Sequence, residues 1–145
     1  MQGLTAGSHR TTPSWAHILR LGRSLDGMNV VGDRTRKLPA PPKVVWASLT
    51  GLHEPGAREW LRLLNDEVEP RVLQAREPDL VVWSSLWPSR PDDEIHLSLA
   101  ASGSDTALRF RLLTPGEMPD DSKTGHLRRR LNELLFADLR FSYGQ

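Results

Sequence analysis

An apolar stripe within residues 126–143 constrains the fold of this chain more than any other feature. Five leucines recur there at helical spacing: Leu127, Leu131, Leu134, Leu135 and Leu139. Arg128, Arg129 and Glu133 fall on the opposite side of the same predicted helix. A helix with one apolar side needs a hydrophobic partner, so the rest of the chain is expected to supply a surface that packs against it.

Most of the chain between residues 29 and 113 has the pattern of short strands. The predicted strands are residues 29–38, 68–76, 80–87, 94–101 and 106–113. The turn-rich connections between the last four are short, which favours an antiparallel meander. In residues 94–101, Ile95, Leu97 and Leu99 alternate with His96 and Ser98. In the last two strands one face is therefore predicted to be buried, and the other, which carries His96, to face solvent.

Two short helices are predicted after the first strand. Prolines at positions 39, 41 and 42 suit a helix start, and residues 42–50 then carry apolar side chains at helical spacing as far as Gly51. Residues 56–64 repeat this spacing, and Asp120, Asp121 or Ser122 can cap the terminal helix. The predicted class is α+β, with a curved antiparallel sheet of about five strands packed around the terminal helix.

The composition excludes several classes of function. With 19 Lys+Arg and 18 Asp+Glu the formal charge is +1, which argues against a broad nucleic-acid-binding surface. Without cysteine the chain has no disulfide, catalytic thiol or thiolate ligand, which is compatible with the cytoplasm. Its five histidines are scattered, so neither a metal site nor a cofactor is predicted. No window holds the roughly 18 apolar residues of a membrane span.

Residues 1–27 are interpreted as a flexible N-terminal tail, and residues 28–145 as one domain. The first 25 residues carry Arg10, Arg20 and Arg23 but no acid, and their apolar positions are isolated. An organellar transit peptide has a similar composition, and a start of translation at Met28 is a third reading of the same residues.

Four sequence segments resemble the START-like, or SRPBCC, superfamily. They are LPAPPKVVWASLTG (38–51), REPDLVVW (76–83), GSDTALRFRL (103–112) and LNELLFADLR (131–140). The resemblance implies a helix-grip fold, in which the sheet wraps the terminal helix and leaves a cavity for a small hydrophobic molecule. Its members include lipid carriers, polyketide cyclases, hormone-binding proteins and chaperone activators, so the fold alone does not select a function. The chain has fewer predicted strands than the family commonly has.

Asp138 is the most informative polar residue. At 100° per residue it lies about 20° from Leu127, inside the apolar stripe, where a carboxylate is costly unless it is paired. Either it forms a structural pair with an arginine, or it is a polar group of the cavity with a raised pKa. Arg36 is a candidate partner because it shares strand parity with Leu38. Arg130 borders the stripe and could reach across the cavity mouth, whereas Glu67 is expected to be solvated.

Trp83 and Trp87 share one face of a predicted strand, where they either fill the core or line the cavity. The predicted ligand-binding residues are Trp83, Trp87, Phe110, Leu134, Asp138 and Arg36.

No motif for nucleophilic or phosphate chemistry is present. The predicted function is binding of a small hydrophobic or amphipathic ligand between sheet and helix. The alternatives are a polyketide cyclase or dehydratase-like enzyme, and an interaction module whose partner is a protein or a second copy of the chain.

Overall fold

The computed structural model describes residues 27–52 and 59–144. Its strands and first helix, in chain order, are β1 (Asn29–Leu38), α2 (Pro42–Thr50), β2 (Val72–Arg76), β3 (Leu80–Ser84), β4 (Glu94–Ser102) and β5 (Asp105–Thr114). One continuous terminal helix follows, made of α3 (Asp121–Glu133), the π-helical segment η1 (Leu134–Leu139) and α4 (Arg140–Ser142). The predicted α+β class with a sheet and a long C-terminal helix is confirmed.

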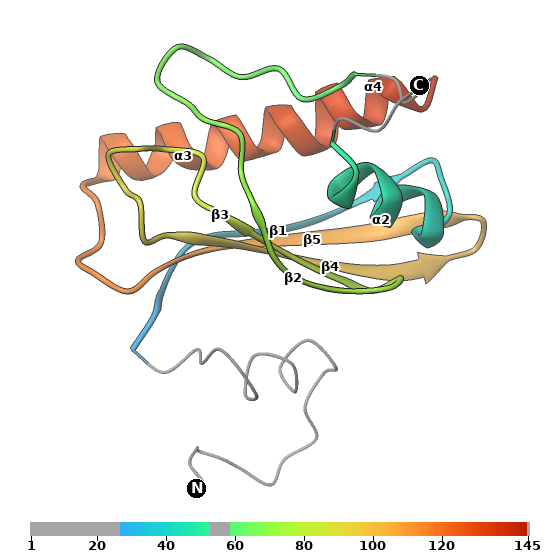
Figure 1. Cartoon of the computed structure of the whole chain (residues 1–145), viewed down its shortest axis with the longest axis horizontal. Coiled ribbons are helices and arrows are strands. Elements are labelled where there is room, and N and C mark those ends of the chain that lie inside the picture. Colours follow the sequence, from blue (N-terminus) through green and yellow to red (C-terminus); the bar gives the residue numbers. More distant parts are fainter. Residues whose placement is uncertain (1–26, 53–58, 145) are drawn as a thin grey trace, which may run out of the picture.

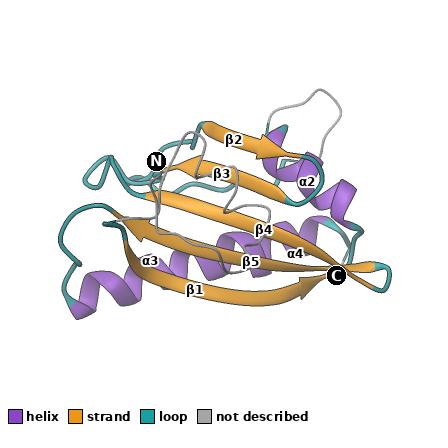
Figure 2. Cartoon of the chain, turned by 90° about the horizontal axis from the view of Figure 1, so that it is seen from below, coloured by secondary structure: helices purple, strands orange, loops and turns teal. Residues whose placement is uncertain are grey.

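The five strands form one antiparallel sheet in the order β1-β5-β4-β3-β2. Figure 1 shows α2 and the terminal helix on the same side of this sheet, and Figure 2 shows β1 and β2 at its two edges. The first strand is paired with the last, so β1 lies beside β5 and far from its neighbour in sequence, β2.

Local sequence signals explain where the helices begin and end. Pro41 stands at the N-cap of α2 and Pro42 at its first position, where a missing N–H costs nothing, and Gly51 ends it. Among the three predicted capping residues, Asp120 caps α3, because its carboxylate accepts a hydrogen bond of 2.8 Å from the Lys123 N–H. The residues of the leucine stripe are fully buried, as predicted: Leu127, Leu131, Leu134, Leu135 and Leu139.

The second predicted helix is wrong in the part that the structure describes. Residues 56–58 of the predicted range lie outside the described residues, and residues 59–64 are not helical. We call residues 59–71 the crossing segment, because they pass over the terminal helix before β2 begins (Figure 1). The segment takes up the start of the predicted strand 68–76, so β2 begins only at Val72.

The outer face of the sheet differs from the prediction. His96 pairs with Arg111 on this face, away from the helices as expected, but it is only 1% exposed. Its Nε2 lies 2.9 Å from a Glu94 carboxylate oxygen. Leu80 and Val82 share the face and are fully buried, so β3 is apolar and buried on both sides, as its unbroken run of apolar residues requires. The expectation that His96 faces solvent is therefore wrong.

Candidate ligand-binding site

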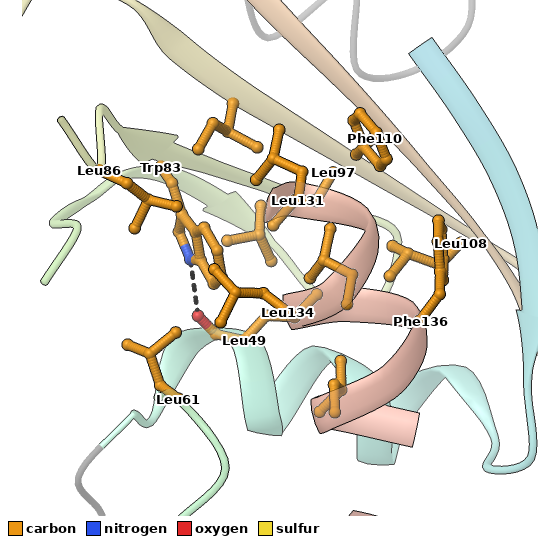
Figure 3. Packing of buried hydrophobic residues seen from close by; sticks show 14 of the residues in the cluster. Leu49, Leu61, Trp83, Leu86, Leu97, Leu108, Phe110, Leu131, Leu134 and Phe136 are labelled. Atoms are coloured by element: carbon orange, nitrogen blue, oxygen red, sulfur yellow. Dashed lines mark hydrogen bonds between the residues drawn. The ribbon is translucent and has the colours of Figure 1, made fainter. Parts of the chain in front are cut away.

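The inner wall of the sheet is aromatic at the end nearest α2. Trp83 projects from β3 toward the helices, and its indole N–H donates a hydrogen bond of 2.9 Å to the Leu49 carbonyl of α2 (Figure 3). Trp60 of the crossing segment stacks on it, with ring centroids 6.2 Å apart and an interplanar angle of 20°. Both rings are buried, and Leu134 of the terminal helix belongs to the same core cluster. The crossing segment thus completes an aromatic layer that the sheet alone does not form.

Phe110 lies toward the β1 side of the same interior. It projects from β5 and packs against Phe136 of the terminal helix, with ring centroids 6.0 Å apart (Figure 3). Four of the predicted ligand-binding residues therefore meet in one core cluster, namely Trp83, Trp87, Phe110 and Leu134. Each is at most 2% exposed, which fits both of the predicted roles, filling the core and lining a cavity.

Trp87 is a buried residue whose indole N–H lacks a well-aligned acceptor. The residue is 1% exposed, and its backbone N–H donates to the Ser85 hydroxyl at 3.0 Å, a turn that ends β3. Its indole N–H has no hydrogen-bond partner among the described residues, although the indole is near enough to the Glu67 carboxylate to help lower the pKa of that group. An indole donor that is buried without a well-aligned acceptor costs free energy in the absence of a partner.

A buried ion pair joins the crossing segment to the terminal helix beside Trp87. The Arg130 guanidinium donates two hydrogen bonds to the Glu67 carboxylate, at 2.6 and 2.8 Å, in the bidentate geometry that Arg favours. It also donates to the Arg62 carbonyl at 3.1 Å and to Glu133 at 2.7 Å. The Glu67 side chain is fully buried and that of Arg130 is 7% exposed. Arg130 therefore reaches from the terminal helix to the crossing segment.

The electrostatics of this pair are set by competition between burial and hydrogen bonding. Burial alone raises the pKa of Glu67, but hydrogen bonds from Arg130 and the Leu64 N–H, with the Arg130 charge, outweigh it and hold the pKa below its usual value. Glu67 itself raises the pKa of Arg130. The predicted solvation of Glu67 is therefore wrong, because its acceptor role depends on the long-range crossing of residues 59–71 over the helix.

Asp138 lies on the same flank of the helix as Arg130. A π-helical turn holds one residue more than an α-helical turn, so η1 rotates the residues after it by up to roughly 100° relative to the α-helical count. Asp138 consequently leaves the centre of the apolar stripe and is half-buried at its border. Burial raises its pKa, the charges of Arg130 and Arg62 lower it, and that of Glu133 raises it further.

The proposed pairing of Asp138 with Arg36 does not form. Arg36 is exposed on the edge strand β1, opposite Leu108, while the arginines that act on Asp138 are Arg130 and Arg62. The parity argument placed Arg36 on the correct face of its strand, since Leu108 is buried. It failed because β1 is an edge strand and the terminal helix does not cover that position.

The candidate site thus combines an aromatic wall of Trp60, Trp83 and Trp87 with a polar border of Glu67, Arg130 and Asp138. Among residues 27–52 and 59–144, no group of three His, Asp or Glu side chains is placed to hold a metal ion. In the same ranges, no helix is long and apolar enough to cross a membrane. The chemistry that the site offers is apolar contact, one buried indole donor and one carboxylate of raised pKa.

Two solved structures share the fold. CalU16 from Micromonospora echinospora has a TM-score of 0.54 and 18% sequence identity, covering 71% of this chain and 68% of its own. The Aha1 dimer from Colwellia psychrerythraea has a TM-score of 0.53 and 15% identity, covering 72% of this chain and 90% of its own. No family model and no curated protein sequence matches the chain. At these identities the likeness shows the fold, which is the helix-grip fold expected from the START-like resemblance.

Proposed function

We propose that the chain binds a small amphipathic molecule beneath its terminal helix, at the end where the crossing segment closes the mouth between sheet and helix. The ring system of the ligand lies against Trp83 and Trp87, and its polar end reaches the border formed by Arg130 and Asp138. Concave sites lined by aromatic side chains with a few convergent polar groups are the usual form of small-molecule sites. Phe110 and Leu134 support this wall from the sheet and from the helix.

The observation that carries the proposal is the indole N–H of Trp87. It is buried and makes no well-aligned hydrogen bond among the described residues, although it lies close enough to the Glu67 carboxylate to help lower the pKa of that group. The indoles of Trp46, Trp60 and Trp83, in contrast, each donate to a backbone carbonyl. A ligand oxygen at this position would satisfy the donor. Because the Asp138 carboxylate flanks the same ion pair, a ligand with a carbonyl or ether oxygen and a nearby hydroxyl group matches both residues.

Entry of a ligand requires displacement of the crossing segment, since the wall residues are at most 5% exposed with that segment in place. The segment has no helix or strand between residues 59 and 71, and its described attachment to the helix runs through Glu67, Arg62 and their partner Arg130. Segments with few backbone ladder bonds open at lower free energy than sheets and helices. The ion pair therefore serves as the latch of the site.

Tryptophan fluorescence with a library of aromatic hydroxy ketones tests the proposal. Binding is expected to quench the wild-type emission saturably, and Trp87→Phe and Asp138→Asn to weaken binding by about tenfold each, the loss of one buried hydrogen bond. Asp121→Asn, at the exposed start of α3, is the matched control and should leave affinity unchanged. Absence of saturable quenching, together with native mass spectra that show no co-purified small molecule, would exclude a binding site here.

A second candidate function rests on the raised pKa of Asp138. A carboxylate whose pKa is raised by burial is suited to proton transfer, so a cyclase or dehydratase-like reaction on a bound polyketide is the alternative. Turnover of an aromatic polyketide that disappears in Asp138→Asn, with binding retained, would favour the enzyme. The same native mass spectra report whether the chain forms a dimer, as the Aha1 structure does.

A further inference from the structure

The other flank of the terminal helix carries a row of exposed arginines that the proposed ligand site does not use. We call Arg34, Arg36, Arg128 and Arg140 the arginine seam. Two of them come from the edge strand β1 and two from the terminal helix, and all four are exposed.

The strand arginines are placed by the register of the sheet. Arg34 pairs with Phe110 and Arg36 with Leu108, and directly paired residues of an antiparallel ladder project to the same face. Because Phe110 and Leu108 are buried beneath the helix, Arg34 and Arg36 project to the helix side of the sheet, one strand further out. Figure 2 shows β1 as the outermost strand on this side.

The two helix arginines lie at the ends of the seam, where each donates a hydrogen bond to a backbone carbonyl of β1. Arg128 donates from Nε to the Val31 carbonyl at 2.7 Å, and Arg140 from Nη1 to the Lys37 carbonyl at 3.0 Å. The two arginines are separated by about 18 Å of helix and the two carbonyls by about 20 Å of strand, so helix and strand run side by side over this distance. Arg34 and Arg36 lie between these two contacts.

The seam is not neutralised by the part of the chain that the structure describes. None of its four arginines forms an ion pair with a described acid. The acids nearest in sequence are engaged elsewhere, because Asp33 pairs with Arg109 at 2.7 Å on the outer face and Glu133 pairs with Arg130. Four guanidinium groups along about 20 Å therefore present unmatched positive charge.

The free edge of β1, next to these arginines, offers backbone groups that can pair with an added strand. The Val31 and Lys37 carbonyls point away from β5, as their bonds to the helix arginines show, and residues of the same parity project their backbone groups in the same direction. Asp33 and Thr35 thus expose backbone N–H and C=O groups at the free edge of the sheet. An added strand would pair with them and place alternate side chains opposite Arg34 and Arg36.

We propose that the arginine seam binds an extended acidic peptide segment of another protein, which adds to β1 as a strand with Asp or Glu at every second position. A second copy of this chain does not fit, because pairing two β1 edges would bring arginines together. The N-terminal residues 1–25 do not fit either, since they contain arginines and no acid. This surface lies on the opposite flank from the proposed ligand site, so the two proposals stand or fall separately.

Fluorescence anisotropy with a labelled ten-residue peptide of alternating Glu and Thr tests the proposal at low salt. Arg34→Glu/Arg36→Glu is expected to weaken binding by about tenfold or more, and rising salt to weaken wild-type binding. The control Lys43→Glu/Arg71→Glu makes the same change in formal charge at exposed positions away from the seam and should alter affinity by less than about twofold. Circular dichroism verifies that both double variants fold.

A second measurement separates strand addition from diffuse attraction. Amide hydrogen exchange of Asp33 and Thr35 should slow when the Glu–Thr peptide binds, and should be unaffected by a Lys–Thr peptide. The proposal is overturned if the control variant loses as much affinity as the seam variant, if those amides stay unprotected, or if a single-stranded oligonucleotide binds the seam more tightly than the peptide does.

Discussion

Arg128 and Arg130 are two residues apart on the same helix, and their surroundings are opposite. Arg130 is 6% exposed, bonds bidentately to the buried Glu67 and lies on what we call the clamped flank, under the crossing segment. Arg128 is exposed, donates to the Val31 carbonyl and lies on the open flank, beside the edge strand β1. The same type of side chain therefore holds the crossing segment on one flank. On the other flank it presents a positive charge that no described acid neutralises.

The difference between the flanks shows what burial demands of a charge. A guanidinium removed from water needs an ionised partner with good geometry, and Arg130 has Glu67, Glu133 and a carbonyl oxygen. An exposed guanidinium needs none, because water solvates it, and its apolar stem can still pack on the protein. Arg128 does this over Gly32, where an added Cβ would approach the Arg128 Cγ to 3.1 Å.

Removing the acid of the clamped flank should have the largest effect on stability. Glu67→Gln keeps the shape of the side chain but leaves Arg130 without its buried counter-charge, so we expect a loss of about 3 kcal/mol in the free energy of unfolding at neutral pH, measured by urea denaturation. Because the folded pKa of Glu67 is depressed, its contribution is present above the usual value of 4.5 and is lost as the pH falls through the folded pKa. The difference between variant and wild type should shrink accordingly in acid.

A double variant sharpens this test. Replacing both partners, as Glu67→Leu/Arg130→Met, removes the uncompensated charge and should recover most of the stability lost in Glu67→Gln. Such a protein would still differ in the placement of the crossing segment, since the hydrogen bond from Arg130 to the Arg62 carbonyl is gone. A double variant that is as unstable as the single one would contradict the view that the cost comes from an unpaired charge.

Removing a charged side chain from the open flank should lower the free energy of unfolding much less. Arg128→Met keeps an apolar stem over Gly32 and deletes one partly exposed hydrogen bond, so we expect a loss of about 1 kcal/mol or less by urea denaturation. Arg129→Met, at the neighbouring exposed position, is the control and should leave stability unchanged within about 0.5 kcal/mol. If Arg128→Met cost as much as Glu67→Gln, the two flanks would not differ as described.

The sequence predicted those parts of the fold that depend on local pattern. The leucine stripe, the Asp120 cap and the bounds of β1 follow from the periodicity and end signals of neighbouring residues, and the structure confirms them. The START-like resemblance supplied the packing of a sheet around the terminal helix, but the pairing of the first strand with the last was not predicted. The burial of Trp83 was also predictable, because it stands in a strand that is apolar on both faces, whereas Trp87 follows that strand in a turn and the stacking of Trp60 on Trp83 was not predicted.

The clamped flank was not predictable, because it depends on a contact between residues 63 positions apart. Glu67 stands beside Asp66 in a polar stretch that is typical of a solvated turn, and nothing local distinguishes the buried acid from the exposed one. Asp138 was misplaced for a different reason. Counting 100° per residue holds only in an α-helix, and the π-helical segment η1 begins four residues before it.

Of these substitutions, Asp138→Asn is expected to change the free energy of unfolding least, and to increase it rather than lower it. Burial raises its folded pKa above the usual 3.8, so the ionised carboxylate destabilises the folded state at neutral pH, and this cost disappears as the pH falls and the folded state takes up the proton. Asp138→Asn should therefore stabilise the protein at pH 7, by less than about 1 kcal/mol because the group is partly solvated and screened. Urea denaturation at pH 7 and near pH 3 measures the effect, and the two proteins should be equally stable at the lower pH.

A variant that is less stable than wild type at pH 7 would mean that the carboxylate holds a structural pair with Arg62 or Arg130. In that case the clamped flank would use every one of its charges to fix the crossing segment, and none would remain for a ligand.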